Sequence, residues 1–229
     1  MAIDCVCDRA ANSQILQTRI AKVENQVVIS GAGRLDDIEP AAAAQIWQQL
    51  GLDVVCITDH NVTSAAVAAA ERDIGARVII GEEVRTPAGD IIGLFLTERI
   101  PYVLPLAQVV SLIRGQGGLV YLPHPFDPGR SSLGEAAVRL CEAADADIIE
   151  AFNAKVEDQA RNDRAAQLAR HYGLPAGAGS DAHDPDGVGA AYLEMPDFDG
   201  PSSFLTSLRD AVITGEYRPH AIRYAPRPR

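Results

Sequence analysis

The sequence predicts an α/β fold whose parallel strands close into a barrel. Short apolar, β-branched segments alternate with segments of helical periodicity along most of the 229 residues. This alternation favours parallel strands joined by helices. Nearly every predicted strand also ends in a charged or amide side chain. A doubly wound sheet concentrates such residues at one switch point, whereas a barrel collects them around one mouth, so the pattern favours a barrel.

Composition indicates one main domain with a substantial core, because 47% of the residues are hydrophobic. We divide the chain into an N-terminal extension (1–21), a barrel domain (22–215) and a C-terminal tail (216–229). The formal net charge of −11 argues against duplex nucleic acid as a partner. No apolar run has the length of a membrane span and no secretory signal is recognisable, so we expect a cytoplasmic protein without membrane contact. The sequence is compatible with a homo-oligomer.

Periodicity and turn residues place the individual elements. The predicted strands are 23–29, 54–58, 77–84, 91–96, 119–125, 147–153 and 176–183. The predicted helices are 40–50, 64–74, 106–115, 134–144, 159–172 and 204–214.

Polar side chains follow the predicted strands directly. They are Asp59, His60, Glu83, His124, Asn153, Asp181 and His183. Taken singly, each has an ordinary structural explanation, such as Asp59 capping a turn beside an incidental His60. Together they bring three of the five histidines to the same end of the sheet as the carboxylates Glu83 and Asp181. That convergence favours a metal site over coincidence.

Imidazole and carboxylate ligands suit Zn, Mn or Fe. A pair of such ions lowers the pKa of a bridging water and clamps the oxygens of a phosphate ester. Glu83 is the natural bridging carboxylate of such a site. Its neighbour Glu82 is expected on the opposite face, because side chains alternate along a strand.

The motifs at these strand ends resemble the polymerase-and-histidinol-phosphatase (PHP) family, in order and spacing, from about residue 23 to about residue 215. They read Ile57-Thr58-Asp59-His60-Asn61, Gly81-Glu82-Glu83, Leu122-Pro123-His124-Pro125-Phe126-Asp127, Glu150-Ala151-Phe152-Asn153-Ala154 and Gly179-Ser180-Asp181-Ala182-His183. The resemblance implies a distorted (β/α)7 barrel, two or three divalent metal ions and metal-dependent hydrolysis of phosphoesters.

The resemblance also implies roles for particular residues. The implied metal ligands are His60, Glu83, His124, Asp181 and His183. Asp59 would be a ligand or would orient one, and Asp59 or His60 would handle a proton. Arg130 would face the substrate phosphate, for which a planar guanidinium is suited, or would be a solvated loop arginine. Asn153 would hydrogen-bond the substrate or simply end its strand.

The chain departs from the family at the opening Asp-x-His-x-His strand and the Ser-x-Asp-Gly loop after it. Glu24, Gln26, Val28 and Ala32 stand at the positions of the Asp, the two histidines and the loop Asp. Glutamine is a poor ligand for Zn or Mn and valine is none, so we expect fewer metals than the family usually holds. In an alternative alignment the first strand is 3–8, with Cys5, Cys7 or Asp8 replacing the histidines.

Three functions are compatible with these residues. The first is metal-dependent hydrolysis of a phosphoester of a small metabolite or nucleotide, with a small phosphorylated molecule as partner. The second is a non-catalytic PHP-fold protein that retains a partial metal site for binding or assembly, which the missing first-strand histidines favour. The third is hydrolysis of a substrate without phosphate, with one or two metals.

Overall fold

The computed structural model describes residues 17–23, 49, 51–72, 74–182 and 189–216. Among them, nine strands form one sheet in the order β7-β6-β5-β4-β3-β2-β1-β8-β9. The strands are β1 (Gln17–Val23), β2 (Val54–Ile57), β3 (Arg77–Thr86), β4 (Gly89–Leu94), β5 (Leu119–Leu122), β6 (Ile148–Asn153), β7 (Ala176–Gly179), β8 (Ala191–Pro196) and β9 (Val212–Gly215). The helices are α2 (Ser64–Ala70), α3 (Leu106–Gly115), α4 (Glu135–Glu142), α5 (Gln159–Tyr172) and α6 (Pro201–Leu208).

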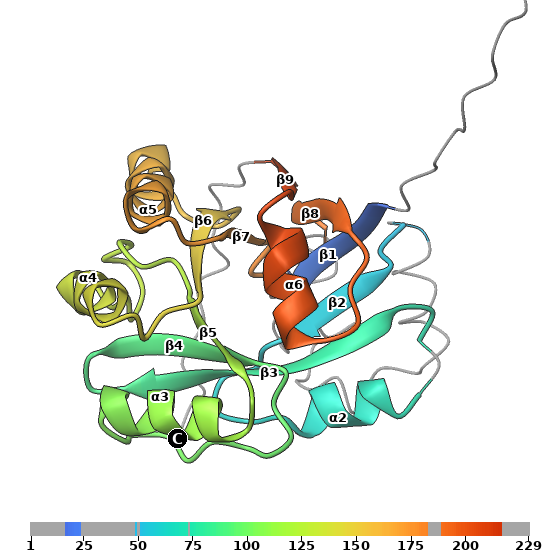
Figure 1. The fold of residues 1–229 in the computed structure, drawn as a ribbon, viewed down its shortest axis with the longest axis horizontal. Helices are drawn as coiled ribbons and strands as arrows, with labels where there is room; N and C mark the ends of the chain where they lie inside the picture. The colour runs from blue at the N-terminus through green and yellow to red at the C-terminus, as the bar shows by residue number, and fades with distance from the viewer. Residues whose placement is uncertain (1–16, 24–48, 50, 73, 183–188, 217–229) are drawn as a thin grey trace, which may run out of the picture.

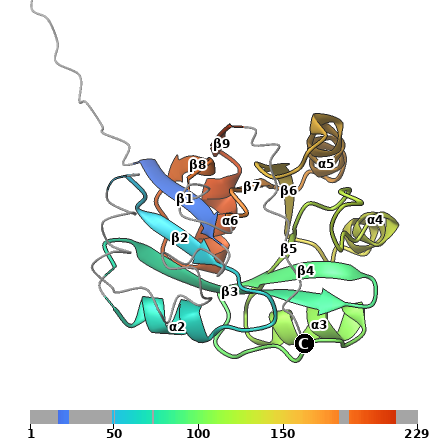
Figure 2. The same cartoon turned by 180° about the vertical axis from the view of Figure 1, so that it is seen from behind.

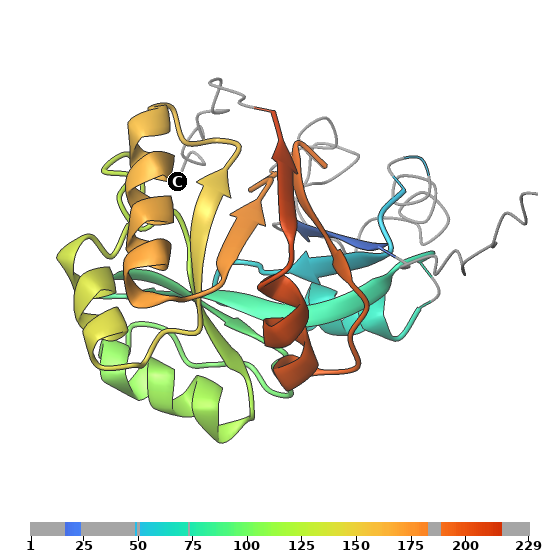
Figure 3. The same ribbon diagram turned by 45° about the horizontal axis from the view of Figure 1, so that its top comes forward.

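The sheet is a distorted barrel, which confirms the predicted fold class. β7 lies beside β8 and β1 although it is at the other end of the strand order, so the sheet curls back on itself (Figure 1). Helices α3, α4 and α5 lie outside the curled half that contains β4 to β7, as Figure 3 shows. Seen from behind, α2 lies along the outside of β2 and β3 (Figure 2).

Two apolar layers explain why β2 is buried throughout its length. Val54 and Cys56 face the barrel interior, where they join a core cluster with side chains of β4, β5 and β8. Val55 and Ile57 face outward and pack against the alanines of α2. A strand buried on both faces reads as a continuous apolar run, which is why the sequence identified it.

The interior of the barrel is closed by a large side chain lying against a strand of small residues. A Cβ atom built on Gly177 of β7 would lie 2.5 Å from Cε2 of Tyr121 on β5. β7 therefore has room for the Tyr121 ring only because its sequence is Ala-Gly-Ala-Gly. On the concave side of the sheet, Phe204 and Leu208 of α6 join the same interior cluster.

Four features differ from the sequence analysis. β4 runs antiparallel to both β3 and β5, because only two residues separate it from β3, too few for a parallel crossover. The predicted helix 204–214 is wrong in its second half, since α6 ends at Leu208 and β9 takes the β-branched residues that follow. β8 was not predicted, although its burial alternates with the period of a strand.

The fourth difference concerns the first strand, β1, which ends at Val23, where the sequence analysis expected it to begin. Residues 24–32, in which the family's first-strand and loop ligands were sought, lie outside the described residues, as do 3–8 of the alternative alignment and most of the predicted helix 40–50. β1 crosses the domain boundary drawn at residue 21, and that division stays a prediction. No helix in the described part of the chain is both long and apolar enough to cross a membrane.

Candidate metal centre

His60 and Glu83 are brought together by the pairing of β2 with β3. The parallel ladder continues beyond β2, because Asp59 O accepts a hydrogen bond from Glu83 N and Glu83 O accepts one from Asn61 N, each at 2.9 Å. His60 therefore lies opposite Glu83. The distance from His60 Nδ1 to Glu83 Oε2 is 3.9 Å.

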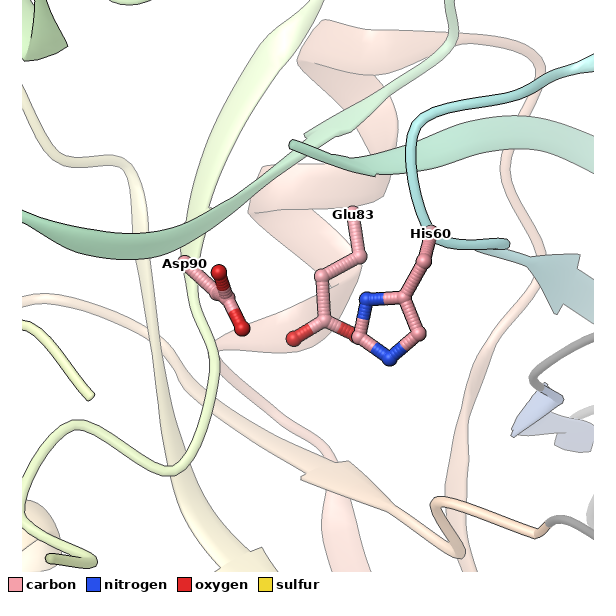
Figure 4. A group of neighbouring side chains, drawn as sticks. All are labelled: His60, Glu83 and Asp90. Atoms are coloured by element: carbon pink, nitrogen blue, oxygen red, sulfur yellow. The ribbon is translucent and has the colours of Figure 1, made fainter. Parts of the chain in front are cut away.

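Asp90 is a third member of this group, and sequence reasoning missed it. In the β3–β4 hairpin Glu83 pairs with Ile92 and Arg85 pairs with Asp90, so Glu83 and Asp90 share one face of the hairpin. One ligand atom from each of His60, Glu83 and Asp90 lies within 4.8 Å of the others. Figure 4 shows the three side chains pointing toward one another. Recognising the two-residue turn between β3 and β4 as a hairpin would have placed Asp90 there.

His124 approaches Glu83 from the other side. Its Nε2 lies 3.2 Å from Glu83 Oε1, so Glu83 lies between two imidazoles with one carboxylate oxygen toward each. The backbone N–H of His124 donates to Glu150 Oε2 at 2.6 Å. The Tyr121 hydroxyl donates to the other Glu150 oxygen at 3.0 Å. Burial and the Glu150 charge raise the pKa of Tyr121 well above its usual value, so this hydroxyl stays a donor.

Glu150 also connects His124 to the second half of the site. Asn153 Nδ2 donates to Glu150 Oε2 at 3.0 Å and to Asp181 Oδ2 at 3.1 Å. The Asn162 side chain of α5 accepts a hydrogen bond from the Asn153 backbone N–H and donates one to the Asn153 backbone carbonyl. Asn153 is fully buried and bridges two carboxylates, an arrangement that explains its position at the end of β6 without a substrate.

Arg130 forms an ion pair with Asp181 through its Nη1. Its Nε lies 3.5 Å from Asp127 Oδ2, and the other oxygen of Asp127 receives Arg161 Nη1 at 2.6 Å. The Arg130 side chain is 20% exposed, so it is part of a largely buried network and not a solvated loop arginine.

Backbone strain marks the same positions. Asn61, His124 and Asp181 have φ values of 60°, 26° and 50°, in or near a left-handed region that costs residues other than glycine about 1–3 kcal/mol each. Asn61 tolerates this conformation, and its Oδ1 accepts a hydrogen bond from Arg85 N at 2.9 Å. Such strain persists where the surrounding structure holds it, and it clusters at functional sites.

Burial raises the pKa of two acidic residues near Glu83. Burial and the neighbouring Glu83 charge raise the pKa of Asp90, and Arg85 partly offsets them through a contact of 3.3 Å. Glu82 lies on the opposite face of β3, as expected, where its Oε2 accepts the Ile100 N–H at 2.7 Å. Burial raises the pKa of Glu82 to about 7, against the lowering effect of Ile100 N–H and Arg99.

Of the two remaining predicted residues, the structure describes Asp59 but not His183. Asp59 is buried at the end of β2, next to His60. His183 lies outside the described residues. Lys155 is a further buried residue that sequence reasoning missed. It follows Asn153 by two positions, and lysine is rarely buried unless it is paired.

The donor set fits a divalent cation. One imidazole and two carboxylates, from His60, Glu83 and Asp90, gather around one point. His124 contacts the other oxygen of Glu83, and Asp181 is linked to His124 through Asn153 and Glu150. Concentrating several carboxylates in a buried mouth is costly unless cations compensate their charge. Mixed nitrogen and oxygen ligands suit Zn, Mn and Fe.

The chain is similar in sequence to two curated proteins and to one family model. The chain is 39% identical to the uncharacterised protein MJ1587 of Methanocaldococcus jannaschii over 122 residues, which cover 52% of this chain and 69% of that protein. It is 38% identical to the uncharacterised protein MJ0417 of the same organism over 142 residues, which cover 57% of this chain and 60% of that protein. Residues 159–213 match the family described as PHP-associated.

A solved structure shares the fold over most of the chain. It is a two-domain protein from Bacteroides vulgatus that contains a predicted PHP-like metal-dependent phosphoesterase, with a TM-score of 0.64 and 16% identity. The match covers 87% of this chain and 65% of that one. At 16% identity this likeness shows the fold. The chain thus shares the fold of PHP-like proteins, and its residues 159–213 match the PHP-associated family.

Proposed function

We propose that the protein is a metal-dependent phosphoesterase that hydrolyses a small phosphorylated metabolite or nucleotide. The observation that carries this proposal is the position of Glu83, whose two carboxylate oxygens each face an imidazole. Asp90 adds a carboxylate to this group, and Arg130 lies beside Asp181 on the other side of Asn153. A cation-binding cluster next to an arginine suits a substrate with phosphoryl oxygens.

Each side chain of the site has its own role in the proposed reaction. His60, Glu83, Asp90, His124 and Asp181 would hold the metal. When bound, a divalent ion supplies Lewis-acid chemistry, which activates water and offsets the charge on the phosphoryl oxygens. The Arg130 guanidinium binds a phosphoryl oxygen, and Asp59 or His60 takes up a proton. Glu150 holds the His124 backbone through a hydrogen bond of 2.6 Å.

Further parts of the proposal concern the metal, the partners and the location. Zinc, manganese or iron fits the ligand types, in fewer copies than the family's usual two or three. The net charge of −11 disfavours duplex nucleic acid as the substrate. Cys56 and Cys141 are buried free thiols, in keeping with a reduced cytoplasmic location.

Metal analysis and a general phosphatase assay test the proposal together. Protein purified without chelator is expected to contain at least about one metal ion per chain and to hydrolyse an aryl phosphate when manganese is added. Little bound metal together with no turnover would exclude the enzyme. Full metal occupancy without phosphate release would instead support one of the two other functions, a binding protein or a hydrolase of a different substrate.

A further inference from the structure

The Arg130 guanidinium lies between two aspartates. One side of it contacts Asp181 Oδ2 through Nη1, and Nε faces Asp127 at 3.5 Å. Asp181 is fully buried and Asp127 nearly so. Arg130 therefore supplies a cation to Asp181 from within the chain.

Asp181 has a second role in the proposed function, as a metal ligand. A carboxylate oxygen that contacts a guanidinium and a divalent ion at once would hold two cations within a few ångströms of each other. The two cations repel each other across a buried site and compete for the charge of the same carboxylate. Metal at Asp181 and the Arg130 ion pair therefore oppose each other.

Arg130 keeps Asp127 as an ion-pair partner when its contact with Asp181 breaks. Asp127 is fixed by Arg161 at 2.6 Å and by the Gly129 N–H at 3.0 Å, and it stays available to Arg130 Nε. The Arg130 side chain is also partly exposed, at 20%, so its Nη groups can turn toward the mouth while Nε keeps its partner.

We propose that Arg130 is an exchangeable cation, which neutralises Asp181 in the metal-free chain and is released by metal to bind the phosphoryl group of the substrate. This inference rests on the proposed function. It makes metal binding and anion binding positively coupled through one residue, and by linkage each ligand strengthens the other.

Metal affinity gives the first test, with manganese titrated into the metal-free protein by calorimetry. Arg130→Gln removes the competing cation, so we expect manganese to bind about tenfold more tightly than to the unmodified chain. Arg130→Lys keeps the charge and should stay closer to the unmodified affinity than Arg130→Gln does. An Arg130→Gln affinity that is unchanged or weaker would overturn the inference.

The matched control is Arg114→Gln. Arg114 also pairs with an aspartate, Asp147, at 2.7 Å, but Asp147 precedes β6 and thus lies at the opposite end of that strand from Asn153. The same charge is lost far from the mouth, so manganese affinity should not change. A tightening equal to that of Arg130→Gln would reveal a general effect of net charge and would also overturn the inference.

Sulfate, a tetrahedral dianion without an ester to hydrolyse, gives the second test. Saturating manganese should strengthen sulfate binding to the unmodified chain by about tenfold, and Arg130→Gln should lose most of that gain. An equal gain in both proteins would show that the coupling does not pass through Arg130. Absence of manganese binding in every variant would instead contradict the proposed function itself.

Should Arg130→Gln fail to fold, the unmodified protein still provides a measurement. Nitrogen-15 NMR follows the Arg130 Nε–H signal while zinc, in place of manganese, is titrated into the metal-free protein. The signal is assigned by its absence from the spectrum of Arg130→Lys. A change of this signal in step with zinc occupancy supports the exchange. An Arg130 signal that is indifferent to zinc overturns it.

Discussion

Glu83 is the residue on which the candidate metal centre depends. It is fully buried, and the alternation of β3 aims it into the mouth while Glu82 points to the Ile100 N–H on the other face. His60 reaches it from the end of β2 and His124 from the end of β5. Two adjacent glutamates therefore have unrelated tasks, because successive side chains of a strand face opposite sides.

Replacing His124 with alanine should lower bound metal sharply while the fold is kept. The substitution removes the imidazole that faces Glu83 at 3.2 Å, but the backbone N–H that bonds Glu150 remains. Metal content by mass spectrometry and circular dichroism check the two parts. The control is His171→Ala on α5, whose ring packs edge-on against Tyr172. Unchanged metal content in His124→Ala would show that the mouth described here is not the metal site.

Glu82 should make stability depend on pH. Burial raises its pKa from 4.5 to about 7, so between these values the folded chain keeps a proton that the unfolded chain has released. The free energy of unfolding therefore falls as pH rises from about 4.5 to about 7, and the contribution of the protonated carboxyl is fully present only below this window.

Glu82→Gln removes this titration. Relative to the unmodified chain, the variant should gain roughly 2–3 kcal/mol between pH 4.5 and pH 8. Urea unfolding of the metal-free protein at both pH values measures the gain, with the exposed Glu135→Gln of α4 as control. Parallel pH profiles for Glu82→Gln and the unmodified chain would contradict the assignment.

At the scale of elements, the site is assembled by strand pairs of both orientations. Parallel pairing of β2 with β3 sets His60 opposite Glu83, whereas antiparallel pairing of β3 with β4 adds Asp90. The small residues of β7 let the Tyr121 ring lie close to the strand and reach Glu150. Packing inside the barrel therefore supports the carboxylate that holds the His124 backbone.

Gly177→Ala should disturb this support. Its Cβ would lie 2.5 Å from the Tyr121 ring, and overpacking of this kind costs about 1–3 kcal/mol. Thermal unfolding should show the loss, and metal affinity should fall with it because Tyr121 and Glu150 shift. Gly115→Ala at the end of α3 is the control, since its Cβ would meet nothing within 4 Å and helical glycine is unfavourable by about 0.5–1 kcal/mol. Equal stability of both variants would refute the role of the small residues of β7.

At the scale of the whole molecule, the curl of the sheet brings distant strand ends to one mouth. Glu83, His124 and Asp181 come from widely separated parts of the sequence, and Asn153 and Glu150 connect them. A metal that binds these groups binds only the folded chain. It should therefore stabilise the entire barrel, because a ligand of the folded state shifts the unfolding equilibrium by mass action.

Removing metal with a chelator should lower the melting temperature. A metal present at about a hundred times its dissociation constant adds about 2.7 kcal/mol to the free energy of unfolding. Differential scanning fluorimetry with and without the chelator measures the shift, and His124→Ala should show a smaller one. A melting temperature indifferent to the chelator in metal-loaded protein would mean that the metal is not held by residues from separate strands.

The sequence by itself determined the fold class, most helices and the strand ends that carry His60, Glu83, His124 and Asp181. These are local properties, because apolar periodicity and the polar residue at a strand end involve residues that are close together in the sequence. α5, for example, begins and ends at the predicted residues, with an Asp158 cap and Gly173 at its end.

Only the tertiary structure decided the supporting role of Glu150 and the Arg130–Asp181 ion pair, whereas the two-residue turn before β4 already implied its antiparallel course and the position of Asp90. Both contacts join segments that are distant in the sequence and depend on the curl of the sheet, and a shift of one residue in register moves a side chain to the other face. The chemistry of the mouth was therefore visible in the sequence, whereas the way its charges compensate one another was not.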